Sequence, residues 1–381
     1  MTCTIVWFRR DLRLVDNPAL DAAVRSGQRI VPVYIHAPEE EAPWPPGAAS
    51  NWWLHHSLIA LDADLRKHGS ALHVARGPTL ATLRQLVSAT NADSVHWNRL
   101  YEPALIARDK EIKAALRGDG TNAESHNANL LFEPWTIATN QDSPYRVFTP
   151  FWRKARAQLE PRPPIDAPKK IASPDIPGGL SIDNLGLLPT IRWDRQFGDH
   201  WQPGEAGAQR ALDEFCVDAL ADYPHERDIP SSPGTSRLSP HLHFGEIGPM
   251  QIVWAIQDRL RHGKSPKAEK AAESYIRELG WREFSHHLLF HFPHMSDRNL
   301  DDRFKGFSWA AQDDDVLRRW QRGDTGIPII DAGMRELWAT GWMHNRVRML
   351  VASFLTKNLR QHWLHGARWF WDTLVDADLA N

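Results

Sequence analysis

The sequence predicts an α/β N-terminal domain with a Rossmann-like parallel sheet, followed by an all-α C-terminal domain. Short apolar runs alternate with helical periods over the first 130 residues, whereas helical periodicity dominates from about residue 205 onward. Between them lie eight prolines from Pro161 to Pro203, a density that interrupts helices and strands alike. We therefore expect domains over 1–130 and 205–381, joined by a linker over 131–204.

The first domain is expected to alternate between strands and helices. Apolar runs rich in β-branched and aromatic residues predict strands, and apolar residues spaced three or four apart predict helices. In chain order these elements fall at 4–8 (strand), 18–26 (helix), 30–35 (strand), 52–68 (helix), 72–75 (strand), 80–90 (helix), 94–97 (strand) and 104–117 (helix). Each strand reaches the next through a helix, which is the connection that parallel strands require.

Two helices expected near the C-terminus carry polar residues that an ordinary core would not contain. Pro328 suits the first turn of one helix, and the second is expected over 345–359. On the second, Asn345, Arg348 and Met349 fall at i, i+3 and i+4 and so share one face. The remaining faces are largely apolar, which predicts burial, so the Asn and Arg either form a structural ion pair or contact a ligand.

Charge and composition exclude several classes of protein. The chain of 381 residues has 45 basic and 47 acidic residues, so any contact with nucleic acid requires a local basic patch. Its two cysteines, Cys3 and Cys216, cannot form a disulfide framework, and no run of 18 apolar residues occurs. We therefore expect a soluble protein in the reducing cytoplasm, without contact to a membrane.

The segment from Pro233 to Ser239, PGTSRLS, is a candidate phosphate-binding loop. The N-terminal domain lacks the G-x-G-x-x-G pattern of dinucleotide-binding proteins, so a bound nucleotide requires another device. Hydroxyl groups and backbone N–H groups near a helix start can hold a pyrophosphate. An ordinary capped turn has the same composition, and both interpretations remain open here.

A predicted helix from about Glu269 to Phe292 combines acidic and aromatic groups. Glu278, Trp281 and Arg282 fall at i, i+3 and i+4. A carboxylate beside an indole suits the edge and the ring of a nucleobase, although a surface ion pair explains the same residues. The chain has 19 His, but no H-E-x-x-H motif and no acidic partner at metal-ligand spacing, so we expect no metal site.

Taken together, five segments resemble the photolyase/cryptochrome family, and the similarity runs along the whole chain. The resemblance is to a class I-type cyclobutane pyrimidine dimer (CPD) photolyase whose C-terminal end is missing. The segments, in chain order, are VWFRRDLRLVDNPAL, RDIPSSPGTSRLSPHLHFGEI, YIRELGWREF, TGIPIIDAGMRELWATGWMHNRVRMLVASFL and DADLAN. In the family the last of these motifs continues beyond the point where this sequence stops.

The resemblance implies that the helical domain binds FAD and that the N-terminal domain holds an antenna chromophore of the folate or deazaflavin type. The contacts to the FAD phosphates and ribityl chain would come from Tyr223, Thr235, Ser236, Arg237, Leu238 and Ser239. The isoalloxazine ring would lie among Asn345, Arg348, Asp376 and Asp378. Asn98, Tyr101 and Glu102 match positions that contact a folate antenna in relatives, whereas Asp297 stands where those relatives carry a lysine.

The resemblance also implies light-driven repair of DNA containing pyrimidine dimers, catalysed by a monomeric carbon–carbon lyase. Excited reduced flavin would give an electron to a dimer flipped out of the helix. The residues implied in catalysis are Glu278, Asn345, Met349, Trp309 and Trp363, the last two as the outer and middle members of a flavin-reducing tryptophan chain. Those implied in DNA and lesion binding are Glu278, Trp281, Arg282, Asn345, Arg346 and Met349.

Met349 bears on the type of lesion, because related enzymes for (6-4) lesions carry a histidine in the matching motif. It therefore favours cyclobutane dimers. Two alternatives to repair are a cryptochrome-like blue-light receptor with FAD but no repair activity, and a flavin-free DNA-binding remnant. Glu278, Trp281 and Met349 argue against a receptor, which has no need of a pocket for a dimer, and the near-neutral charge argues against a DNA-binding remnant.

Overall fold

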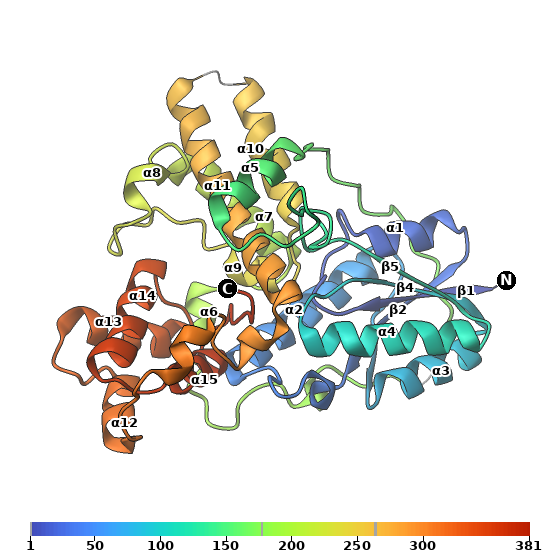
Figure 1. The fold of residues 1–381 in the computed structure, drawn as a ribbon. Helices are drawn as coiled ribbons and strands as arrows, with labels where there is room; N and C mark the ends of the chain where they lie inside the picture. Colours follow the sequence, from blue (N-terminus) through green and yellow to red (C-terminus); the bar gives the residue numbers. More distant parts are fainter. Residues whose placement is uncertain (1, 177, 263–264) are drawn as a thin grey trace.

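A computed structural model describes residues 2–176, 178–262 and 265–381, and it has the expected two-part architecture (Figure 1). The N-terminal part is a five-stranded parallel sheet in the order β3-β2-β1-β4-β5. Its strands are β1 (Cys3–Phe8), β2 (Arg29–His36), β3 (His73–Arg76), β4 (Ala92–Asn98) and β5 (Asn122–His126). The prediction of an α/β domain with a parallel sheet is confirmed.

Helices cover both faces of this sheet, because side chains alternate between the faces along each strand. They are α1 (Pro18–Arg25), α2 (Ala48–Lys67), α3 (Thr79–Thr90) and α4 (Pro103–Gly118). From β1, Val6 and Phe8 pack in one core with α1 and α2, whereas Ile5 and Trp7 pack in another with α3 and α4. The predicted elements are present, but β5 was not predicted.

From Glu205 onward the described chain is largely helical, as expected, and α5 and α6 lie within the expected linker. Its longer helices are α5 (Phe148–Ala157), α7 (Glu205–Glu214), α10 (Pro249–His262), α11 (Pro266–His291), α12 (Asp314–Arg322), α13 (Pro328–Thr340), α14 (Asn345–Ser353) and α15 (Trp363–Thr373). Three are short: α6 (Phe197–His200), α8 (Tyr223–Glu226) and α9 (Ser239–His243). Five-residue π-helical turns occur at Phe215–Ala219 and Phe354–Asn358, and single 3₁₀ turns at Pro38–Glu41, Asp183–Leu185, Pro293–Ser296 and Asp302–Gly306.

The two C-terminal helices form where the sequence predicts them. Pro328 stands at the start of α13, and Gly341 ends it in the left-handed conformation with φ 69°. The second predicted helix is α14, whose end widens into the π-helical turn that closes at Asn358. Within the expected linker, α5 packs through Phe148 and Phe151 into the core of the helical region.

The segment after β1 joins the sheet to the helical region through buried polar contacts. Arg13 is fully buried and donates to the carbonyls of Gly245 (2.8 Å) and Ala128 (2.9 Å). Glu205, at the start of α7, accepts the backbone N–H groups of Leu14 and Val15 at 2.8 and 3.0 Å. Buried backbone groups require such partners, so this contact, here called the interdomain seam, fixes the two parts relative to each other.

The C-terminus falls in the middle of the view in Figure 1, and the exposed Asn381 lines a cavity of the helical region. In the part of the chain that the structure describes, no helix is both long enough and apolar enough to cross a membrane.

Candidate functional site

A cavity of about 700 Å³ opens into the helical region and is lined by residues far apart in the sequence. They come from the 235–239 loop, from α11, α14 and α15, and from residues 376–381. Fourteen of the predicted site residues line it: Tyr223, Thr235, Ser236, Arg237, Leu238, Ser239, Glu278, Arg282, Asn345, Arg348, Met349, Trp363, Asp376 and Asp378. Three others, Trp281, Trp309 and Arg346, lie outside its lining.

Arg348 and Asp376 form an ion pair in the wall of this cavity. Asp376 Oδ2 accepts from Arg348 Nη2 at 2.8 Å and from Ser239 Oγ at 2.6 Å. Arg348 Nε also donates to the carbonyl of Met343, which fixes the guanidinium on α14. Asp376 Oδ1 is buried and has no hydrogen-bond partner among the described residues. A buried acceptor without a donor is costly, so this oxygen suits an N–H group of a ligand.

The 235–239 loop is held from two sides. Ser236 Oγ accepts from the Tyr275 hydroxyl at 2.8 Å. Arg237 has φ 52°, the left-handed conformation that residues other than glycine rarely adopt. Its guanidinium lies over the rings of Trp342 and Trp201, with centroids 4.7 and 5.6 Å away. The positive charge is therefore stacked on indoles beside the loop and leaves the hydroxyl and backbone groups of Thr235–Ser239 facing the cavity.

Glu278, on α11, is paired with Arg227 at the side of the cavity. The Arg227 guanidinium also lies 5.3 Å from the centroid of the buried Tyr223 ring. Tyr223 in turn packs against Tyr275, with centroids 5.1 Å apart. These contacts place the Glu278 carboxylate next to Tyr223 while leaving it about one third exposed, with 30% of its side-chain surface accessible.

The open side of the cavity is formed by residues on α14. Met349 is 55% exposed and Asn345 is also exposed, although both line the cavity. Arg346 does not line the cavity; it pairs with Asp228 at 2.7 Å, and its Nη1 lies 3.7 Å from Met349 Sδ at the rim. Met349 thus offers an apolar contact at the open mouth to a ligand that enters there.

Trp281 and Arg282, which were both predicted to bind DNA, lie in different environments. Trp281 is 43% exposed, and one face of its ring stacks on Phe148 of α5, with centroids 3.6 Å apart. Arg282 is largely buried and donates to the carbonyl of Asn129 at 2.7 Å. Its guanidinium thus joins α11 to the segment after β5, and this structural contact was not expected.

The two predicted chain tryptophans are connected through a histidine. The rings of Trp309 and His362 are 5.0 Å apart, and those of His362 and Trp363 are 5.8 Å apart. Trp363, at the start of α15, lines the cavity, whereas Trp309 lies further out and is partly exposed. The aromatic series therefore leads from the surface to the cavity.

Several buried groups near the cavity have shifted pKa values. Burial, together with the nearby charge of Arg10, lowers the pKa of His243 to about 3. Burial alone would raise the pKa of Asp378, but His286 and His243 more than offset this, and the pKa lies below its ordinary range. The carboxylate of Asp378 accepts from the N–H of Ala380 at 2.8 Å. Asp378 is therefore ionised at neutral pH, and His243 is neutral.

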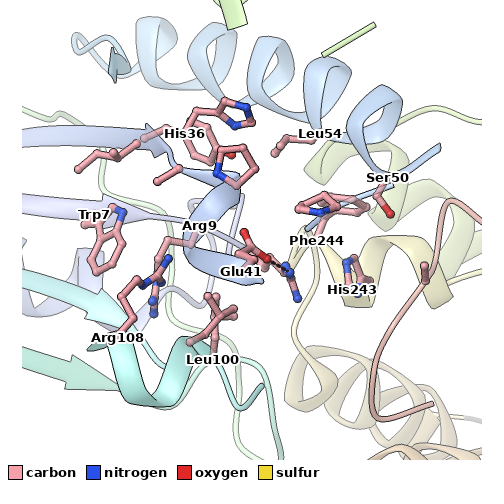
Figure 2. A pocket seen from close by; sticks show the side chains of 18 of the residues that line it. Trp7, Arg9, His36, Glu41, Ser50, Leu54, Leu100, Arg108, His243 and Phe244 are labelled. Atoms are coloured by element: carbon pink, nitrogen blue, oxygen red, sulfur yellow. Dashed lines mark hydrogen bonds and ion pairs between the residues drawn. The ribbon is translucent and has the colours of Figure 1, made fainter. Parts of the chain in front are cut away.

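A smaller pocket, of about 50 Å³, lies at the carboxyl ends of β1 and β2, where a doubly wound sheet commonly binds ligands. Figure 2 shows Trp7 and Arg9 at the end of β1 facing Arg108, with Glu41 between them and His243. His243 lines both this pocket and the larger cavity, as do Trp371 and Ala377. None of these shared residues was predicted, because only the fold brings their segments together.

The residues expected to contact a folate antenna already have partners. The Asn98 amide donates to Asp11 at 2.7 Å and to Asn17 at 2.8 Å. The Tyr101 hydroxyl donates to Glu133 at 2.9 Å, and Glu102 pairs with Arg10. These groups are satisfied within the protein, so their sequence positions do not by themselves indicate a ligand.

Comparison with known proteins gives two family matches. The model for DNA photolyase matches residues 4–169, and the model for the FAD binding domain of DNA photolyase matches residues 275–381. A deoxyribodipyrimidine photo-lyase of Agrobacterium fabrum is 48% identical over 99% of this chain and 78% of that protein. Cryptochrome-1 of Arabidopsis thaliana is 39% identical over 99% of this chain and 56% of that protein.

Among solved structures, a bacterial class III photolyase from Agrobacterium tumefaciens superimposes with a TM-score of 0.95. It is 47% identical, and the alignment covers 100% of this chain and 78% of that one.

Proposed function

Since the chain belongs to the photolyase/cryptochrome family and carries its FAD-binding domain, we propose that it repairs cyclobutane pyrimidine dimers in DNA as a light-driven carbon–carbon lyase. The observation that carries the proposal is the composition of the 700 Å³ cavity. It combines a buried Arg348–Asp376 pair in its wall with Asn345 and Met349 at its open mouth and Glu278 at its side. Repair requires both features, because the wall would hold the cofactor and the open mouth would admit the lesion.

The residues of the cavity fit FAD. Its volume lies within the range of about 300–1,000 Å³ that small-molecule sites occupy. The unpaired Asp376 Oδ1 offers an acceptor for an N–H group of the flavin, and Ser236 and Ser239 offer hydroxyls for its polar chain. When bound and reduced, FAD supplies the light-excited electron that opens the cyclobutane ring.

The protein's own groups orient the cofactor and control its charge. Arg348 places a guanidinium beside the cavity, where it donates to Asp376 and to the Met343 carbonyl, and Asp376 is held in turn by the Ser239 hydroxyl. A fixed positive charge favours a negatively charged ring system next to it. Asp378, ionised at neutral pH, supplies an acceptor on the same wall.

We propose that the lesion enters at the open side of the cavity. A damaged base pair costs less to unstack than a sound one, which lets the dimer leave the helix. Glu278 would accept from the pyrimidine edge, and Met349 and Asn345 would pack against the dimer. The exposed face of Trp281 would stack on nucleic acid outside the cavity, and Arg346 at the rim would contact a phosphate.

The subclass, the antenna and the state of association remain predictions. A class I type was expected from the sequence, whereas the solved structure described above is a class III photolyase. We propose a monomer that acts on DNA in the cytoplasm, with domains over 1–130 and 205–381 and an antenna chromophore of the folate or deazaflavin type.

A second candidate function is a blue-light receptor that binds FAD without repairing DNA. The similarity to a protein named Cryptochrome-1 favours it. The exposed Met349 and the partly exposed Glu278 at the cavity favour repair, because a receptor does not need to admit a dimer.

The test is to illuminate the FAD-loaded protein with a thymine-dimer oligonucleotide and to follow the recovery of thymine absorbance. Glu278→Gln removes the charge of the proposed lesion contact and should slow repair by about 10-fold or more, since a hydrogen bond to a charged group is worth roughly 1.5–3 kcal/mol. Glu269→Gln, at an exposed position in the first turn of the same helix, is the control and should repair at the rate of the unaltered protein. A flavin-loaded protein that repairs nothing would contradict the proposal and favour the receptor.

A further inference from the structure

Three potential metal ligands lie together on the N-terminal sheet, remote from the cavity described above. His96 is on β4, and Glu124 and His126 are on β5, the edge strand. His96 pairs directly with Glu124 in the parallel register. Because side chains alternate along a strand, Glu124 and His126 project from the same face of the sheet as His96. None of the three lines the 700 Å³ cavity.

Their ligand atoms are close enough to share one cation. His96 Nδ1 and His126 Nε2 face each other at 3.1 Å, and the chosen atoms of all three residues lie within 4.8 Å of one another. Two nitrogens bound to Zn²⁺ at about 2.0–2.1 Å in tetrahedral geometry are roughly 3.3 Å apart. The imidazoles are therefore already at the spacing of a metal-bound pair.

The Glu124 carboxylate can complete the set without moving the backbone. Its only described side-chain hydrogen bond is to the exposed amide of Asn122, at 3.2 Å. The two imidazoles make no described side-chain hydrogen bond except to each other. Neither a buried ion pair nor a backbone contact therefore competes for these atoms within the described chain.

The cations nearest the imidazoles have partners of their own. The neighbouring cations Arg99 and Lys113 are occupied, Arg99 by Glu133 and Lys113 by the hydroxyl of Ser125.

We propose that His96, Glu124 and His126 form a binding site for a divalent transition metal of the Zn²⁺ type. Two imidazoles and a carboxylate are typical ligands of Zn²⁺ and related ions, with solvent in the remaining position. The expectation of no metal site rested on ligand spacing along the chain, whereas this set forms between two strands. A bound ion would fasten the edge strand β5 to β4 by side chains as well as by the backbone ladder.

The test is calorimetric titration of the chelator-treated, FAD-loaded protein with Zn²⁺ alone. We expect one ion per chain. His126→Asn should weaken binding by at least about 100-fold. Losing a residue that binds the metal directly should lower the affinity at least as much as losing a residue that only hydrogen-bonds to a ligand. The matched control is His73→Asn, which changes a half-buried histidine on β3, the opposite edge strand, and should leave the affinity unchanged.

Glu124→Gln is the second variant, because it removes only a charge from a partly exposed position and leaves the fold intact. It should also weaken binding, by about 10-fold. No binding by the unaltered protein, or equal binding by the His126→Asn and His73→Asn proteins, would overturn the proposal. FAD absorbance and dimer repair, measured on the same samples, should not depend on Zn²⁺, so the outcome is separate from that of the proposed repair activity.

Discussion

The ion pair between Arg348 and Asp376 should contribute several times more to stability than a similar pair on the same helix. Arg346, two residues earlier on α14, pairs with Asp228 at 2.7 Å, and Arg348 pairs with Asp376 at 2.8 Å. The two pairs differ in burial. The aspartate side chain is 3% exposed in the Asp376 pair and 50% exposed in the Asp228 pair. The comparison therefore isolates the effect of the environment on one kind of interaction.

The magnitudes follow from this difference. An exposed ion pair is worth about 0.2–1 kcal/mol, whereas removing one partner of a buried pair costs about 3–5 kcal/mol. The Arg348 side chain is 23% exposed, so the loss of stability caused by Asp376→Asn should fall below that range, at about 2–3 kcal/mol. Asp376 also accepts from Ser239, so the substitution weakens a second hydrogen bond. Asp228→Asn should cost about 0.5 kcal/mol.

The assay is urea unfolding of the FAD-free protein, carried out as two double-mutant cycles. One cycle combines Asp376→Asn with Arg348→Met, and the other combines Asp228→Asn with Arg346→Met. The coupling energy should be about 2 kcal/mol in the first cycle and below about 0.5 kcal/mol in the second. Equal couplings in the two cycles would refute the reasoning from burial. FAD affinity, measured in parallel, should fall for Asp376→Asn and stay unchanged for Asp228→Asn.

Two further predictions concern electron transfer and pH. Trp309→Phe should slow photoreduction of oxidised flavin, measured by its visible absorbance, without loss of bound flavin; an unchanged rate would remove Trp309 from the chain. Burial raises the pKa of Glu283 to about 7 from an ordinary value of 4.5, so the folded protein holds a proton that the unfolded chain releases between these values. The free energy of unfolding should therefore fall by about 3 kcal/mol as pH rises from about 4.5 to 7, and Glu283→Gln should remove this slope in urea titrations at several pH values.

Most of the site could be predicted because its residues lie in long segments with a strong local pattern. Asn345, Arg348 and Met349 share one face of α14. The preceding helix, α13, begins at Pro328 and ends at Gly341, so α14 forms after that glycine. Helical periodicity depends on neighbouring residues alone, so it survives without knowledge of the fold. The helical pattern could not decide whether Asn345 and Arg348 form a structural ion pair or contact a ligand, because the cavity forms only in the folded protein.

One strand and two side-chain contacts could not be predicted, because they depend on tertiary packing that a local sequence pattern does not reveal. β5, NAESH, buries only Ala123 fully and is otherwise polar, so it has no apolar alternation to identify it as a strand. Trp281 stacks on Phe148, which lies more than a hundred residues away in a segment expected to be a linker. Arg282 donates to the carbonyl of Asn129, which only the tertiary fold brings near, and its role at DNA stays a prediction.

The interdomain seam sets a condition on exchanging parts between relatives. Arg13 lies in the N-terminal domain but donates to the carbonyl of Gly245 in the helical region. Gly245 also lies close to the backbone of Arg10, because a Cβ added at Gly245 would stand 2.1 Å from the Arg10 carbonyl oxygen. A chimera that takes its first 130 residues from one relative and its helices from another would have to inherit both sides of this contact together. Residues 10–13 and the segment at Gly245 should therefore be exchanged as one unit.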